Sequence, residues 1–145
     1  MAAHTTASAT DPRDLGAFVL RISLGVLFLA HAALKIFVFT LPGTAGFFAA
    51  QGFPAWTAYA VVAGELAIGL GLILGILVRL ASIASLPILA GALAVHLPNG
   101  WVFSAPNGGW EFPAFLIVAV IVQALLGAGA YAVKLPYLSS RLAHA

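Results

Sequence analysis

The sequence contains no cysteine and very little charge, and both shortages narrow what the protein does. Without cysteine, the chain itself supplies no disulfide, thiolate metal ligand, iron–sulfur ligand or dithiol relay. Charged residues make up only 7% of the chain, whereas hydrophobic residues make up 63%. Soluble domains are roughly 45–50% apolar, so this chain has more apolar surface than its own interior accommodates. We therefore expect part of that surface to face lipid.

The weak basic excess does not indicate a nucleic-acid-binding protein. Six lysines and arginines stand against four acidic residues, and they form no basic run and no basic and aromatic face. Their positions along the chain are better interpreted as a signal for membrane topology.

Four apolar segments are each long enough to cross a bilayer, which takes about 20 helical residues. We expect helices at about residues 15–39, 55–75, 80–97 and 112–133. A short helix is expected around Phe47 and Phe48, and the two Asn-Gly pairs in 98–111 predict tight turns. The predicted fold is all-α, an integral membrane four-helix bundle with up-down-up-down topology over 15–135. Residues 1–14 and 136–145 are predicted cytoplasmic tails, the first of them flexible.

With four spans, both termini and the 75–79 turn lie on one side of the membrane. Most of the basic residues fall on that side, so the positive-inside rule predicts cytoplasmic termini and a bacterial-type inner membrane location. The residues are Arg13, Arg21, Arg79, Lys134 and Arg141. A secretory signal peptide competes at the N-terminus, because Ala30-His31-Ala32 fits a cleavage pattern. The apolar run continues to Phe39, which favours a retained span.

Ionisable residues inside the predicted spans are the main functional signal. His31 and Lys35 share one face of the first span, and Glu65 lies about 15 Å below the start of the second. His96 is at the outer end of the third span. A charged group at bilayer depth costs roughly 2.5–3.5 kcal/mol unless it is paired, so Glu65 should pair with His31 or Lys35. We predict a polar pocket in the outer half of the bilayer.

Within that pocket, His31, Lys35 and Glu65 are the candidate catalytic residues. His96 and the outer-loop residues Asn99, Trp110 and Glu111 are the candidate substrate- or quinone-binding residues, and no metal site is predicted. Each also has a structural interpretation. A lysine near a helix end can extend to the interface, a buried histidine can bond a carbonyl, and Glu111 can cap a helix N-terminus.

The order and spacing of these motifs over roughly 15–133 resemble the DoxX family of small membrane proteins. Matching stretches are LGVLFLAHAALK at 24–35, Phe47-Phe48, Gly52-Phe53-Pro54, Gly64-Glu65-Leu66, Gly69-Leu70, 77–81, His96 with Asn99-Gly100, and Gly109-Trp110-Glu111. The family commonly has glycine after the first-helix histidine, where this chain has Ala32. The resemblance implies a four-helix membrane bundle of a family often labelled as oxidoreductases. Some relatives are associated with a thiosulfate:quinone oxidoreductase and others with quinone-related operons.

Several functions remain open at this point. The first is a redox-associated membrane subunit whose pocket binds a quinone and whose electrons come from a partner. The second is a non-catalytic assembly or anchoring subunit that docks another protein or a second copy of the chain. Transport of a small solute or proton is a lesser alternative. Haem held by His31 and His96 is disfavoured, because no sequence spacing links the two ligands.

Overall fold

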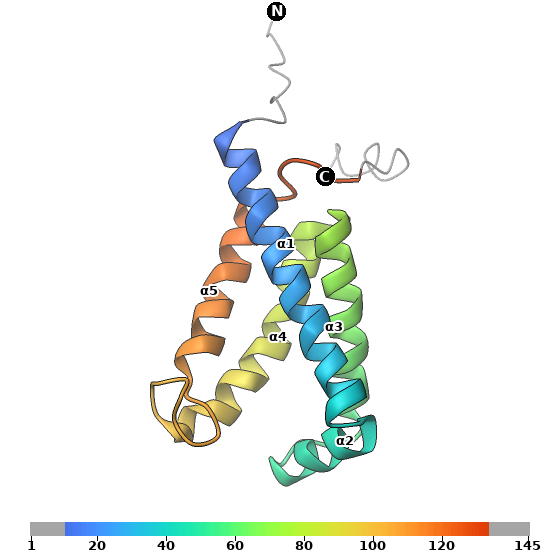
Figure 1. Cartoon of the computed structure of the whole chain (residues 1–145), viewed down its shortest axis with the longest axis vertical. Coiled ribbons are helices and arrows are strands. Elements are labelled where there is room, and N and C mark those ends of the chain that lie inside the picture. The colour runs from blue at the N-terminus through green and yellow to red at the C-terminus, as the bar shows by residue number, and fades with distance from the viewer. Residues whose placement is uncertain (1–10, 134–145) are drawn as a thin grey trace, which may run out of the picture.

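The computed structural model describes residues 11–133 and shows an all-helical arrangement (Figure 1). Five α-helices follow one another: α1 (Pro12–Ala33), α2 (Leu41–Ala50), α3 (Thr57–Leu74), α4 (Val78–His96) and α5 (Glu111–Leu126). A π-helix, η1 (Leu34–Val38), continues α1, and a short 3-10 helix, η2 (Leu97–Asn99), follows α4. The short helix predicted around Phe47 and Phe48 is confirmed as α2. The predicted tail at 136–145 and residues 1–10 lie outside the described range.

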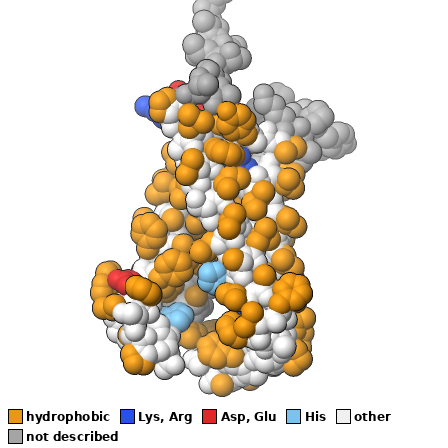
Figure 2. All heavy atoms as spheres, in the orientation of Figure 1, with side chains coloured by type: hydrophobic (Ala, Val, Ile, Leu, Met, Phe, Trp, Pro, Cys, Tyr) orange, Lys and Arg blue, Asp and Glu red, His pale blue; other side chains and the backbone are white. Residues whose placement is uncertain are grey.

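Three of the described helical segments are long and apolar enough to cross a membrane. They are Pro12–Val38, Thr57–Leu74 and Val78–Asn99. The segment α5 is apolar but has 16 residues, about 24 Å of helix. Many large apolar side chains on the outer faces of the helices are exposed, among them Leu125 at 74% and Leu80 at 60%. Figure 2 shows such side chains spread over the visible face. A lipid environment is the natural solvent for this surface.

The ends of two helices differ from the sequence-based expectation. The first helix begins at Pro12 instead of Leu15, because Pro12 suits a first helical position and the Asp11 side chain accepts a hydrogen bond from the Arg13 N–H. The last helix ends at Leu126 instead of Val133. Gly127 follows it with φ of 81°, in the region that favours glycine.

Two glycines bring α1 and α3 close together. A Cβ at Gly69 would lie 2.8 Å from the Leu29 side chain and 3.0 Å from the Gly25 carbonyl oxygen. A Cβ at Gly25 would in turn lie 3.0 Å from the Gly69 carbonyl oxygen. Small residues allow this close approach between apolar helices. Further neighbouring pairs are α3 with α4, α4 with α5, α2 with α3, and α1 with α5.

A buried arginine of α1 binds both the end of α3 and the segment that follows α5. Arg21 is fully buried, and its Nη1 donates to the carbonyls of Leu72 at 2.7 Å and Ile73 at 2.9 Å. Its Nη2 donates to the Ala130 carbonyl at 3.0 Å. The guanidinium thus satisfies the free carbonyls at the end of α3 and holds the segment that follows α5. From the sequence, Arg21 was predicted only as a topology signal, whereas in the structure it also binds the backbone of two other segments.

Candidate functional site

Lys35 of η1 and Glu65 of α3 form a largely buried ion pair. Lys35 Nζ lies 2.7 Å from Glu65 Oε1 and 2.9 Å from Oε2, so the amine donates to both carboxylate oxygens. The Glu65 side chain is only 5% exposed and that of Lys35 is 17% exposed. Of the two partners expected for Glu65, the structure therefore selects Lys35.

The geometry of the α1–α3 contact explains the pairing. Measured along the helices from the contact between Gly25 and Gly69, Lys35 lies ten residues away and Glu65 four residues away on the same side. These steps correspond to about 15 Å and 6 Å. Side chains lean toward the N-terminus of their own helix, so in this antiparallel pair they lean toward each other. The long lysine side chain spans the remaining offset.

The backbone around Lys35 departs from a regular α-helix. Residues Leu34–Val38 form a π-helix, in which the Phe39 N–H donates to the Leu34 carbonyl at 2.9 Å. Single π-turns of this kind occur frequently at functional sites. The Lys35 carbonyl also accepts a hydrogen bond of 3.2 Å from the hydroxyl of Thr44, a buried residue of α2. Lys35 therefore connects α1 with both α2 and α3.

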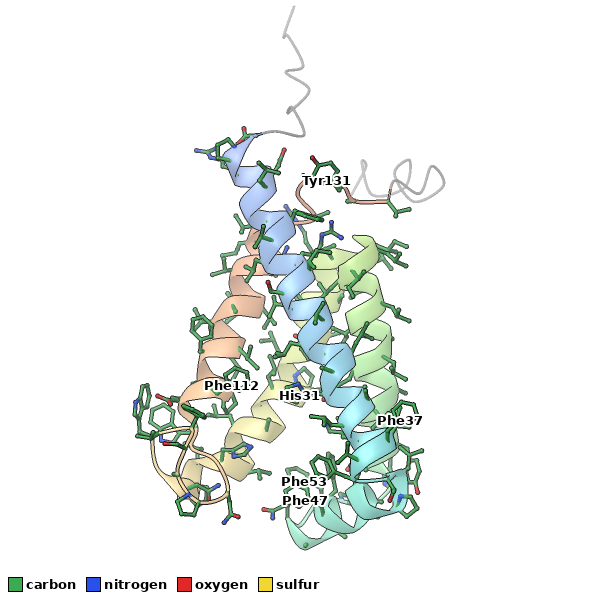
Figure 3. The ribbon with its side chains drawn as sticks, in the orientation of Figure 1. His31, Phe37, Phe47, Phe53, Phe112 and Tyr131 are labelled. Carbon is green, nitrogen blue, oxygen red and sulfur yellow. The ribbon has the colours of Figure 1, made fainter. Side chains whose placement is uncertain are left out.

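The ion pair lies in the wall of a cavity of about 510 Å³. Its polar lining residues come from α1, η1, α3, α4 and the turn after α2, and phenylalanines together with aliphatic residues form the rest. The polar residues are His31, Lys35, Gln51, Thr57, Glu65 and His96, and the aromatic residues are Phe28, Phe47, Phe48, Phe53 and Phe112. In Figure 3, His31, Phe47, Phe53 and Phe112 border one space, whereas Phe37 lies on the other side of α1. The structure thus brings four of the seven predicted site residues into one cavity.

Each of the two cavity histidines is held by a backbone carbonyl. His31 Nδ1 lies 2.9 Å from the carbonyl oxygen of Leu27, one turn earlier in α1. His96 Nδ1 lies 3.0 Å from the carbonyl oxygen of Gly108, in the loop before α5. The imidazole rings are therefore fixed in orientation and line the cavity from α1 and from α4. Neither ring is a partner of Glu65 among the described hydrogen bonds.

The other three predicted site residues flank the loop between α4 and α5, with Asn99 at the end of η2 and Trp110 and Glu111 at the start of α5. None of them is among the residues that line the cavity. Asn99 Nδ2 donates to the carbonyls of Asn107 and Gly108 at 3.1 and 2.9 Å. Glu111 Oε1 accepts from the Phe103 N–H at 2.7 Å. Trp110 packs edge-on against Trp101, with ring centroids 4.4 Å apart. These contacts stabilise the loop that positions His96, and a direct binding role for the three residues stays a prediction.

The loop itself forms the turns that its Asn-Gly pairs predict. Asn107 and Gly108 both have positive φ, at 66° and 76°, and the N–H of Trp110 donates to the carbonyl of Gly100. Gly109 packs so closely on the backbone of Val102 that a Cβ would clash with it. Because Gly108 O accepts from both His96 and Asn99, the loop conformation fixes the position of the His96 ring.

The phenylalanines that line the cavity were not predicted as site residues from the sequence. Phe47, Phe48 and Phe53 surround the cavity from α2 and the turn after it, and Phe112 does so from α5. The sequence does contain a signal for this lining, since paired aromatics precede a Gly-Phe-Pro turn on the outer side, where the pocket is predicted. In an apolar chain, however, the same residues also fit a lipid-facing surface.

The segment of the chain that contains the ion pair and both cavity histidines matches a known protein family. The sequence model of the DoxX family matches residues 16–98, which include His31, Lys35, Glu65 and His96. The chain belongs to the DoxX family. It is also 28% identical over 115 residues to the protein named "Putative oxidoreductase CatD" of Bacillus subtilis (strain 168), and the alignment covers 79% of this chain and 81% of that protein. No solved structure gives a significant match.

Proposed function

We propose that this DoxX-family membrane protein binds the ring of a quinone-type molecule in the cavity, as part of a membrane redox system. The observation that carries the proposal is the largely buried Lys35–Glu65 pair in the wall of an otherwise largely apolar cavity, part of whose lining is phenylalanine. An ionisable pair at this depth is costly to bury, and a role in ligand binding or proton exchange accounts for its presence.

The size and lining of the cavity suit a flat, weakly polar ring. A volume of about 510 Å³ falls within the range of roughly 300–1,000 Å³ that small-molecule sites occupy. Phenylalanine side chains offer faces and edges for stacking, and a few polar groups offer hydrogen bonds to ring oxygens. A quinone-type ring has this combination of a planar apolar body and oxygens at its edge.

Proton exchange with the ring oxygens is the chemistry that the polar groups supply. Quinone and quinol interconvert with equal numbers of electrons and protons, so a site for the couple needs groups that donate and accept protons. Lys35, Glu65 and His31 are such groups, and they lie on the α1 and α3 side of the cavity. The electrons would come from a partner redox protein, because this cysteine-free chain supplies no thiol couple. The name of the Bacillus subtilis relative, "Putative oxidoreductase CatD", supports a redox setting.

The site lies, in this proposal, in the outer half of a bacterial inner membrane. We place α5 across the membrane together with the three longer segments, so that Asp11 and the turn before α4 lie on the cytoplasmic side. The exposed residues Arg13 and Arg79 support this orientation, whereas Trp56 and Trp101 are exposed toward the proposed outer edge. Arg21 is buried and counts less as a topology signal, and Lys134 and Arg141 lie outside the described residues.

Ligand binding by the purified full chain tests the proposal. Ultraviolet difference titrations with a short-chain ubiquinone or menaquinone analogue should show saturable binding in detergent or in lipid nanodiscs. Phe112→Ala should weaken that binding about tenfold, because Phe112 lines the cavity. Phe115→Ala is the matched control on α5, since its side chain is 66% exposed and does not line the cavity.

The same preparation separates this proposal from a purely structural role. A chain that shows no saturable quinone binding while it retains its helical content contradicts the redox proposal. If that chain also purifies with a stoichiometric protein partner, the function as an assembly subunit is favoured instead.

A further inference from the structure

The two histidines that line the cavity are held in the same way, each through its Nδ1 atom. In each, Nδ1 contacts a backbone carbonyl oxygen, at 2.9 Å for His31 and 3.0 Å for His96. A carbonyl oxygen only accepts hydrogen bonds, so Nδ1 must carry the hydrogen. A neutral imidazole has one ring N–H, which is then the one at Nδ1. The other nitrogen, Nε2, is then an acceptor with a free lone pair.

These acceptors lie on different walls of the cavity. His31 comes from the last turn of α1 and His96 is the last residue of α4, and both line the same space. Figure 2 shows the two described histidines beside a hollow in the lower part of the molecule. In Figure 3, His31 projects from α1 into that space. A ring bound there meets an imidazole acceptor on each side.

The remaining polar groups increase the excess of acceptors. The hydroxyl of Thr57 donates to the Pro54 carbonyl at 2.7 Å, which leaves its oxygen to accept. The Glu65 carboxylate keeps unused lone pairs beyond its two bonds with Lys35. Among the described residues that line the cavity, the donors are the third N–H of Lys35 and the amide of Gln51. The site therefore accepts more hydrogen bonds than it donates.

Oxidised and reduced rings differ in what they offer to such a site. The oxygens of a quinone only accept hydrogen bonds, so facing neutral imidazoles they would oppose lone pair to lone pair. The hydroxyls of the reduced ring donate, and each satisfies one acceptor. We infer that the cavity preferentially binds the reduced form, a dihydroxyarene of the quinol class. This inference rests on the proposed function and specifies which form of the couple the site recognises.

The roles of the individual residues follow from this inventory. One hydroxyl of the ring donates to Nε2 of His96, and the other donates to Nε2 of His31 or to the Glu65 carboxylate. Lys35 directs its remaining N–H to a ring oxygen. The phenylalanines contact the faces and edge of the ring. The inference concerns equilibrium binding alone and requires no electron transfer by this chain.

A matched pair of ligands tests the inference. Under anaerobic conditions, the full chain in lipid nanodiscs is titrated with decyl-ubiquinol and with decyl-ubiquinone, which share ring substituents and tail. We expect the dissociation constant of the quinol to be about tenfold lower, the ratio that roughly one net hydrogen bond gives. A redox titration of the bound couple should then show a midpoint potential about 30 mV more positive than that of the free couple.

Removal of single acceptors supplies the second part of the test. His96→Phe and His31→Phe keep an aromatic ring but remove Nε2, so each should bring the quinol-to-quinone affinity ratio closer to one. Phe112→Ala is the control, because loss of a stacking surface should weaken both forms by a similar factor. Circular dichroism and elution volume report whether each variant is folded, and the wild-type affinity ratio tests the inference without any variant.

The outcomes distinguish the two proposals. Equal affinities, or tighter binding of the quinone, overturn the preference for the reduced ring and leave the quinone-type site standing. An affinity ratio that neither folded histidine variant changes also overturns the assignment of the imidazoles as acceptors. If neither ligand binds to the folded wild-type chain, the proposed function and this inference both fail.

Discussion

Gly25 of α1 and Gly69 of α3 pack against each other so closely that a Cβ on either would lie 3.0 Å from the other's carbonyl oxygen. This contact fixes the separation and the register of the two helices, and the register in turn brings Lys35 within 2.7 Å of Glu65. The polar site near one end of the molecule therefore depends on small residues nearer the middle.

Replacement of Gly69 with valine should separate α1 from α3 and weaken the ion pair. A branched side chain there would overlap Leu29 and the Gly25 backbone, and overpacking of this kind costs about 1–3 kcal/mol. The expected result is a lower melting temperature in detergent together with weaker ligand binding. Gly46→Val is a control outside this interface, because no atom lies within 4 Å of a Cβ at that position. Equal melting temperatures for Gly69→Val and the wild type would contradict the account of this contact.

The Lys35–Glu65 pair should behave as a coupled unit in a double-mutant cycle. Loss of one partner leaves the other charge buried and unpaired, so Lys35→Met and Glu65→Gln should each destabilise the fold by about 3 kcal/mol. The double variant should recover most of that loss, because neither charge remains. Reversible unfolding in detergent measures the coupling. Strictly additive losses would show that the two side chains act independently.

The same double variant separates stability from binding. With both charges absent, the fold is expected to be near wild-type stability, while quinone-type ligands should bind more weakly because the cavity has lost its ionisable pair. Wild-type affinity in a stable double variant would show that the ion pair serves helix packing alone.

Arg21 should be important for stability and difficult to replace with lysine. Its guanidinium donates to three carbonyls at the end of α3 and in the segment after α5. Arg21→Met should cost about 3 kcal/mol or more, because bonds from a charged donor are worth roughly 1.5–3 kcal/mol each. Arg21→Lys should retain only part of the stability that Arg21→Met loses, because an ammonium lacks the planar fork that reaches all three oxygens. Thermal melting of the variants measures the difference, and full recovery in Arg21→Lys would contradict this role.

The absence of cysteine makes the proposed orientation directly testable. Single cysteines can be introduced at exposed positions without removing native ones, for example Val102→Cys in the loop before α5 and Arg79→Cys near the start of α4. In intact cells, a membrane-impermeant maleimide should label the first and spare the second. Labelling in the reverse order would place the cavity in the cytoplasmic half of the membrane.

The ion pair was predictable from the sequence because charge is rare in this chain and deep charges need partners. Lys35 and Glu65 stand out against apolar neighbours, and helical spacing alone places both in the outer half of the predicted bilayer span. The family resemblance on the 24–35 and 64–66 motifs is also confirmed by the DoxX match. The choice between Lys35 and His31 as the partner of Glu65 needed the crossing geometry of α1 and α3.

Other features were hidden because one residue type serves two purposes in a membrane protein. From the sequence alone, phenylalanines such as Phe47 and Phe53 fit a lipid-facing position as well as a cavity-lining one. Arg21 fits the positive-inside pattern as well as an internal hydrogen-bonding role, and only the carbonyls of distant residues decide between them. The end of α5 was misplaced because the sequence stays apolar through Val133, whereas Gly127 turns the chain earlier.

The central claim is that a quinone-type ring occupies the cavity beside Lys35 and Glu65, and photoaffinity labelling tests it most directly. The full chain in lipid nanodiscs is irradiated with an azido-quinone, and the labelled positions are identified by mass spectrometry. We predict labels on cavity-lining residues, such as those from Phe47 to Phe53 and Phe112, which excess unlabelled quinone suppresses. Labels on lipid-facing residues such as Phe37 and Phe115, insensitive to competition, would contradict the claim.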